Sequence, residues 1–433
     1  MESSNALRAF EAMLEQAAPA RASEPGWLAE ARHAGLEAFR LQGIPTTGHE
    51  EWRSTPLAAL AATAFAPAPT SAGPAPTAVG PLAGLGGNRV EIINGAPILP
   101  DGRRQGAGSS TFLLSAATPE EQAAVMRRLG RTHSLNSHPF AALNLALHGD
   151  ALVIHVTADA TEPLHIRHCA LPSDRPFATA VRVLVVAEPN ARAALVETFE
   201  GPAGGAYLTN AVIEFWLGDG AAVEHCRIQV EGADATHLSL SHAMVGRDSR
   251  FASTNISLGA ALARYDGNAS MVGSGGECTL NGVYVAAGTQ LIDNHTYIDH
   301  AVAHCQSHEL YKGVLADRSR GVFNGKILVR EDAQKTDAKQ TNQVLLLSGD
   351  AQIHTKPQLE IFADDVRCTH GATIGRLDAD ALFYLRARGI LAEQAHTMLV
   401  AAFAGDVIER IADETLRGVV DALVRDALRA GLT

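Results

Sequence analysis

A cysteine and a histidine two residues apart form the pair most suited to chemistry in this chain. Cys368 and His370 lie in the segment 364–375, near the end of a long strand-rich region. Alternate residues of an extended strand project from the same face, so the thiol and the imidazole would point the same way. A thiolate beside an imidazole suits iron, zinc or copper, whereas magnesium and calcium prefer oxygen ligands. The spacing therefore predicts half of a soft-metal site.

Half a site leaves two interpretations open. A closed metal site usually has four protein ligands, and this pair supplies two. A single cysteine often packs as a small hydrophobic residue, and a nearby histidine often only hydrogen-bonds the backbone. Cys368 and His370 are then either structural residues or part of a site that a partner chain completes.

Three further histidines, His300, His304 and His308, follow one another at even spacing in the sequence. If their segment were one continuous strand, one face would carry all three imidazoles. Residues four apart on a strand are about 13 Å apart, which is too far for one ion to bind all three directly. We therefore expect a hydrogen-bonded structural role rather than a metal site.

Composition narrows the class of protein. The 433 residues carry a net charge of -12, which argues against nucleic acid and anionic membranes and favours proteins or small ions as partners. No apolar run reaches the roughly 18 to 20 residues of a membrane span. Glu2, Glu11 and Glu15 disfavour a secretory or transit peptide, so a cytoplasmic location is expected.

The cysteines and glycines exclude other common sites. The five cysteines are scattered without a Cys-x-x-Cys, so we expect neither a disulfide framework nor a zinc finger. The segment Gly321–Lys326 is one residue too short for a Walker motif and is followed by Ile327 instead of Ser or Thr. We therefore expect that this chain binds no ATP.

Cys368 and His370 lie in the region 151–376, which must position them. This region consists almost entirely of predicted strands. Its turn signals recur at about 15 residues or about twice that, which indicates coils of roughly 30 residues with more than one strand each. One coil cannot bury its inward face alone, so coils stack into a β-helix and the ends need caps. A β-sandwich is the competing fold, but its turns usually come every 8 to 12 residues or so.

Helical patterns flank this core. The predicted division is an N-terminal helical region (1–60), an Ala/Pro-rich linker (61–87), a mixed connecting region (88–150), the β-helix core (151–376) and a C-terminal helical domain (377–433). The fold class expected is mainly β, with α-helical regions at both ends.

A β-helix enzyme acting on carbohydrate is a second class to consider. It would need grouped carboxylates, for example Asp364 with Asp365 or Asp293 with Asp299. Adjacent residues on a strand point to opposite faces, so Asp364 and Asp365 favour a turn. Only 5% of the residues are aromatic and no export signal is evident, which disfavours this class.

A series of short motifs carries a specific resemblance. They are LYKGVL (310–315), GVFNGKI (321–327), AQKTDA (333–338), LLLS (345–348), KPQLEI (356–361), DDV (364–366) and FYL-x-x-RGI (383–390). In this order they resemble the SufB/SufD family of iron-sulfur cluster assembly proteins, and Glu51-Trp52-Arg53 extends the likeness toward the N-terminus. The segment from His370 to Gly375 resembles the SufD branch more than the SufB branch.

The resemblance implies a right-handed parallel β-helix between helical domains and a complex with SufB and the ATPase SufC. It implies that SufB joins through the β-helix, that SufC binds the C-terminal helical domain, and that this chain is a non-catalytic scaffold subunit. A homodimer of the isolated chain remains open.

The resemblance also gives the Cys368–His370 pair a role. In the family a nascent iron-sulfur cluster is thought to form transiently at the interface of SufB and SufD, where a histidine matching His370 faces a SufB cysteine. We predict that His370 and Cys368 bind iron or the nascent cluster together with SufB. A purely structural scaffold, in which His370 binds no metal, is the alternative.

Overall fold

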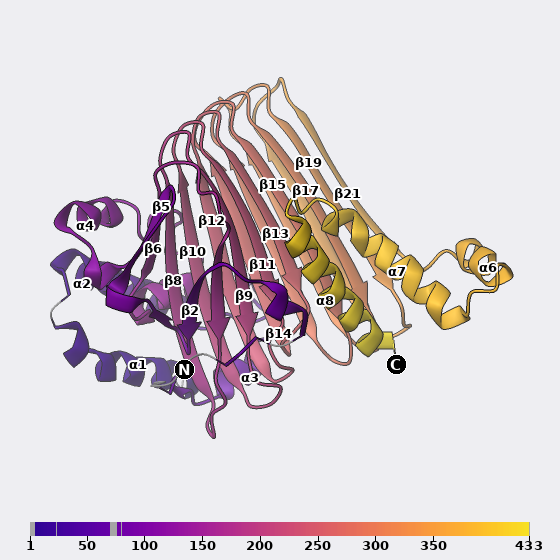
Figure 1. Ribbon diagram of the computed structural model, residues 1–433, viewed down its shortest axis with the longest axis horizontal. Helices are drawn as coiled ribbons and strands as arrows, with labels where there is room; N and C mark the ends of the chain where they lie inside the picture. The colour runs from indigo at the N-terminus through magenta and orange to yellow at the C-terminus, as the bar shows by residue number, and fades with distance from the viewer. Residues whose placement is uncertain (1–4, 23, 70–75, 79, 433) are drawn as a thin grey trace.

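The computed structural model describes residues 5–22, 24–69, 76–78 and 80–432. Its body is a parallel β-solenoid, with the N-terminal helices at one end of the long axis and the C-terminal helices toward the other (Figure 1). The predicted mainly β fold with helices at both ends is confirmed.

Two long sheets form the solenoid, and from β6 onward successive strands alternate between them. Within the described residues the first sheet has eleven strands and the second has ten. The first contains β1 (Ala66–Pro67), β4 (Arg103–Gly106), β5 (Ser109–Leu113), β6 (Leu152–Val156), β8 (Phe177–Ala187), β10 (Tyr207–Leu217), β12 (Ala235–Val245), β14 (Leu262–Met271), β16 (Leu291–His300), β18 (Arg320–Val329) and β20 (Gln352–Ile361). The second contains β2 (Asn88–Ile93), β3 (Ala96–Ile98), β7 (Leu164–Cys169), β9 (Arg192–Glu200), β11 (Ala222–Gln229), β13 (Arg250–Ser257), β15 (Glu277–Ala286), β17 (Gln306–Leu315), β19 (Asp337–Leu346) and β21 (Arg367–Gly375).

The register confirms coils of about 30 residues. From β6 to β21 all pairing within a sheet is parallel, and paired residues are between 26 positions apart (Thr236 and Leu262) and 32 positions apart (Arg320 and Gln352). A sandwich is excluded because each strand from β8 to β19 pairs with the strands one coil before and one coil after it.

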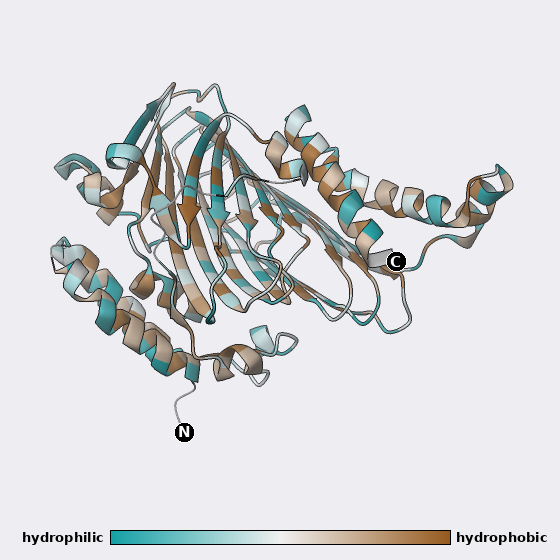
Figure 2. Cartoon of the chain, turned by 60° about the horizontal axis from the view of Figure 1, so that its bottom comes forward, coloured by the Kyte–Doolittle hydropathy of each residue, from teal (hydrophilic) through white to brown (hydrophobic). Residues whose placement is uncertain are grey.

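Alternation along the strands fills the interior. Figure 2 shows hydrophobic and hydrophilic residues in turn along many of the strands. Phe215, Phe251 and Phe323 project inward into one cluster with aliphatic side chains such as Val185. Because no coil covers its own inward face, the stacking of neighbours provides most of this burial.

The N-terminal end of the solenoid is covered. The β4–β5 hairpin continues the first sheet by antiparallel pairing with β6, and β3 pairs with β2 at the end of the second sheet. The helices here are α1 (Asn5–Ala17), α2 (Gly26–Gln42), α3 (Ala58–Ala62), α4 (Pro119–Met126) and α5 (Pro139–Leu147). The Asn144 side chain on α5 donates to the backbone oxygens of Val181 and Asn210, which fixes this helix on the outer face of β8 and β10.

The predicted linker 61–87 is only partly described, because residues 70–75 and 79 lie outside the described residues. Its described part contains β1, which pairs with β8, and a short 3-10 helix, η3 (Gly80–Gly84). Leu82 and Leu85 pack in one cluster with the last helix. The division of the chain into domains stays a prediction.

The C-terminal helices pack on the outside of the second sheet. These are α6 (Ala379–Ala387), α7 (Ala392–Ile408) and α8 (Glu414–Leu432). Val400 and Val420 lie in one cluster with Ile228, Val283 and Val314 of the strands. By contrast, α6 projects away from the solenoid (Figure 1). Among the described helices, none has the length and apolar character needed to cross a membrane.

Candidate functional site

The C-terminal end of the solenoid is open. Within the described residues, β20 pairs only with β18 and β21 pairs only with β19, so each ends its sheet with a free edge. A free edge presents N–H and C=O groups that another strand can pair with. We call this region, made of β20 and β21, the open end.

Cys368 and His370 both lie on the inward face of β21. Cys368 is in register with Ala338, which is in register with Ser307 and then with Cys278 of the interior core. His370 is in register with Gln340. The structure therefore places the two side chains on one strand face at the rim of the interior.

The two groups differ in exposure. Cys368 is half-buried and packs against the cluster that contains Ala338 and Ala363. Burial, together with the nearby Asp337 carboxylate, raises the pKa of the Cys368 thiol, so metal binding would require it to lose a proton. His370 is exposed, and within the described residues no hydrogen bond of its imidazole is found. His370 is thus the more accessible of the two side chains.

The pair has no third ligand close by. Within the part of the chain that the structure describes, no group of three or more His, Cys, Asp or Glu side chains is arranged to hold a metal ion. Cys368 and His370 thus offer two donors on an open rim.

Apolar side chains surround this rim. Phe362 is 65% exposed, Ile374 48% and Ile361 39%. Ile361 and Ile374 are on the terminal strands, where the next coil would cover them. Exposed apolar residues beside free strand edges are typical of a surface that binds another chain.

His300, His304 and His308 do not lie on one continuous strand. β16 ends at His300 and β17 begins at Gln306, and His304 adopts a positive φ of 63° in the turn between them. His300 is fully buried with its Nε2 2.8 Å from the Ser307 hydroxyl, whereas His308 is exposed. The turn separates the three imidazoles because the buried Cys305 and its neighbours connect the two sheets there.

The carboxylates considered for carbohydrate chemistry are engaged elsewhere. Asp293 is fully buried and accepts from Arg264 at 3.2 Å, and Asp299 pairs with Arg330 at 2.6 Å. Asp365 forms an ion pair with Lys335. Each of these three carboxylates is thus paired with a cation, and Asp293 shares Arg264 with Asp266.

Two polar residues inside the last coils were missed by sequence reasoning. Glu309 and Gln340 are 3% and 1% exposed, and Gln340 Nε2 donates to Glu309 Oε2 at 2.5 Å. Burial raises the pKa of Glu309 to about 7, and the hydrogen bond from Gln340 opposes this rise. The positions 309, 340 and 370 follow each other by about one coil, but the distance between paired residues varies from coil to coil, so this spacing alone does not show that they are in register.

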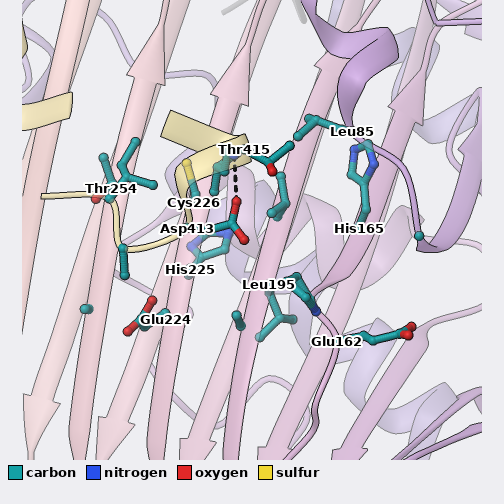
Figure 3. Close-up of a pocket in the computed structure, with 18 of the residues that line it drawn as sticks. Leu85, Glu162, His165, Leu195, Glu224, His225, Cys226, Thr254, Asp413 and Thr415 are labelled. Carbon is teal, nitrogen blue, oxygen red and sulfur yellow. Dashed lines mark hydrogen bonds between the residues drawn. The ribbon is translucent and has the colours of Figure 1, made fainter. Parts of the chain in front are cut away.

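A pocket of about 550 Å³ lies elsewhere, between the second sheet and the turn joining α7 to α8 (Figure 3). Burial lowers the pKa of His165 to about 4 and raises the pKa of Cys226 to about 12. At neutral pH both groups are therefore uncharged. The pocket shares no lining residue with the open end.

Comparisons with known proteins agree on one family. The family model described as "SUF system FeS cluster assembly, SufBD core domain" matches residues 171–403. An iron-sulfur cluster assembly SufBD family protein of Synechocystis is 30% identical over 94% of this chain and 92% of its own length. The iron-sulfur cluster assembly protein SufD of Escherichia coli is 29% identical over 99% of this chain and 98% of its own. SufD of Bacillus subtilis is 26% identical over 65% of each.

Proposed function

Because the chain belongs to the SufBD family of iron-sulfur cluster assembly proteins, we propose that it is the SufD-type subunit of a scaffold complex with SufB and SufC. In this proposal it contributes to iron acquisition, and the nascent cluster forms where its open end meets SufB. The observation that carries the proposal is the position of Cys368 and His370 on the inward face of the last strand, which pairs along one edge only within the described residues.

The shape of the open end supports a β-solenoid as the partner. Both sheets end with free edges, so a second solenoid of the same strand spacing could extend both. The exposed Phe362 and Ile374 would be buried in such a contact. When no SufB is present, a second copy of this chain could occupy the same edges as a homodimer.

The chemistry of the pair supports a shared site. His370 would supply a neutral imidazole and Cys368 a thiolate, and SufB would supply the remaining ligands of iron or the transient cluster. The exposed His370 can bind without rearrangement of the core, whereas Cys368 must first be deprotonated. Iron and the cluster are the cargo of the complex and are passed on after assembly.

The C-terminal helices support a second partner. Phe383 and Tyr384 on α6 are 73% and 58% exposed, and Leu391 and Met398 follow at 67% and 49%. This apolar strip fits the docking of SufC, which would hydrolyse ATP for the complex while this chain remains a non-catalytic scaffold. The five free cysteines fit a reducing cytoplasm as the place of action.

The test is the cluster content of the assembled complex. Wild-type chain and His370→Ala are co-expressed with SufB and SufC without oxygen, and iron and acid-labile sulfide are measured per complex. His354→Ala is the matched control, because His354 is also an exposed histidine of the last coil but alternates with the inward-facing residues of β20. We expect His370→Ala to lose most of the cluster at unchanged subunit recovery and His354→Ala to keep it.

The opposite result selects the alternative. If His370→Ala retains full iron and sulfide, the chain is a structural scaffold without metal ligands. Cys368→Ser, measured in parallel, decides whether the thiolate is a second ligand or a packed residue.

A further inference from the structure

We infer that Gln340, oriented by Glu309, positions His370 for iron by accepting a hydrogen bond from the imidazole nitrogen that does not bind the metal. The inference rests on the proposed role of His370 as a ligand and adds two residues to that site. Neither residue would touch the iron, so both are positioning residues.

The three residues occupy one inward position in three successive coils. Glu309 on β17 is in register with Gln340 on β19, and Gln340 is in register with His370 on β21. Neighbouring strands lie about 4.8 Å apart, so the side chain of Gln340 has Glu309 on one side and His370 on the other. Glu309 is two strands below His370 and is separated from it by Gln340.

The amide of Gln340 is held from one side. Its Nε2 donates to Glu309 Oε2 at 2.5 Å, and both side chains are almost fully buried. The opposite sheet leaves room for this amide at Gly325, where an added Cβ would lie 2.3 Å from Gln340 Nε2. A side chain at position 325 would therefore displace the amide of Gln340.

The amide oxygen is left without a partner. Gln340 Oε1 is buried, and it accepts no hydrogen bond from any residue that the structure describes. Buried polar atoms are nearly always hydrogen-bonded, so this oxygen calls for a donor. Because the amide nitrogen faces Glu309, the geometry turns the oxygen away from β17, and on the other neighbouring strand the residue in register is His370.

Metal binding would supply that donor. A histidine that binds a metal through one ring nitrogen almost always donates its other N–H to a carbonyl or carboxylate oxygen, which fixes the ring and its tautomer. Iron held between His370 and a partner at the open end lies on the outer side of the ring, which leaves the second N–H toward the interior. The unpartnered oxygen of Gln340 is the acceptor in register there.

The test is the affinity of the complex for ferrous iron. Fe²⁺ is titrated without oxygen into purified complexes of SufB, SufC and each variant of this chain. We expect Gln340→Leu to weaken Fe²⁺ binding about tenfold or more, as is usual when such a supporting hydrogen bond is lost. Asn342→Leu is the matched control, since Asn342 is equally buried on the same strand but is in register with Ala372.

Three further variants separate positioning from general damage to the fold. Glu309→Met combined with Gln340→Met removes both partners, so no buried carboxylate is left unpaired, and the same loss of affinity is expected. The exchange Glu309→Gln with Gln340→Glu keeps a donor–acceptor pair and an acceptor beside His370, and it should restore Fe²⁺ binding. In the His370→Ala background, Gln340→Leu should cause no further loss.

The outcomes distinguish this inference from the proposed function. If His370→Ala binds Fe²⁺ as tightly as the wild type, the proposed function fails. If His370→Ala weakens binding but the intact Gln340→Leu complex binds like the wild type, the inference about Gln340 is overturned and the proposed function stands. Loss of affinity that adds to that of His370→Ala would also overturn it.

Discussion

The two ends of the solenoid differ in how they are finished. At the N-terminal end the first sheet continues through the antiparallel strands β5 and β4, and helix α5 covers the outer face of the first coils. At the C-terminal end both sheets stop at free edges, and apolar residues such as Phe362 are exposed. The first end is thus finished by short antiparallel strands with helices packed beside them, whereas the open end presents the edges of two long strands to a partner.

The ion pairs at the two ends also differ in how deeply they are buried. Arg182 and Glu214, under the N-terminal elements, are fully buried 2.9 Å apart, and Glu214 also accepts from Gly130 N and the Thr132 hydroxyl. Near the open end, Lys335 and Asp365 form an ion pair that is more than half exposed. The covered end thus depends on its polar contacts for stability, and the open end does not.

The largest effect is therefore expected from Glu214→Leu. The variant leaves Arg182 as a buried, unpaired charge, which typically costs about 3 to 5 kcal/mol of folding free energy. Urea unfolding of the isolated chain measures the loss. A change below about 1 kcal/mol would show that the covered end does not depend on this pair.

The next largest effect is expected in the pH dependence of folding stability, through a buried histidine at the covered end. Burial, with nearby His133 and His138, lowers the pKa of His242 to about 3. Since the unfolded value is about 6.5, the unfolded chain binds the proton first, so stability is complete above about pH 6.5 and falls as the pH drops toward 3. Between pH 7 and pH 5 the loss from this group is about 2 kcal/mol.

Urea unfolding of wild type and His242→Gln at these two pH values measures that contribution. The variant should lose about 2 kcal/mol less than the wild type over this interval. If the free energy of unfolding fell equally between pH 7 and pH 5 for wild type and His242→Gln, the pH dependence would not come from His242.

At the open end, substitutions are expected to change the binding of SufB rather than the stability of the fold. Ile374→Asp should weaken binding of SufB about tenfold, because a carboxylate would be desolvated in the contact. The stability of the isolated chain should change by less than about 0.5 kcal/mol. Sedimentation with purified SufB measures the affinity. Leu41→Asp, at an apolar residue that is 84% exposed on α2, is the control and should bind SufB normally.

The smallest effect is expected for Asp365→Ala. Removal of this exposed ion pair with Lys335 should change stability by less than about 1 kcal/mol, in contrast to the buried pair of Arg182 and Glu214. The comparison uses the same urea unfolding experiment. Similar losses for both pairs would remove the distinction between the two ends.

Local patterns predicted the fold and part of the site. The recurrence of turns predicted the coil length, and strand alternation predicted that Cys368 and His370 share a face, because both depend only on nearby residues. The same alternation failed for His300 and His308, since it assumed a strand where the chain turns from one sheet to the other. The alignment of Glu309, Gln340 and His370 in three successive coils could not be predicted, because it depends on the register between strands, and residue spacing alone does not fix that register.

The most direct test of the open end as a shared interface is amide hydrogen exchange in β20 and β21, with and without SufB. In the isolated chain the outward amides of both strands lack partners, so they should exchange rapidly. Addition of SufB should slow exchange in both strands and leave β4 and β5 unchanged. Slowed exchange elsewhere with unaltered β20 and β21 would contradict the account, because SufB would then bind a different surface.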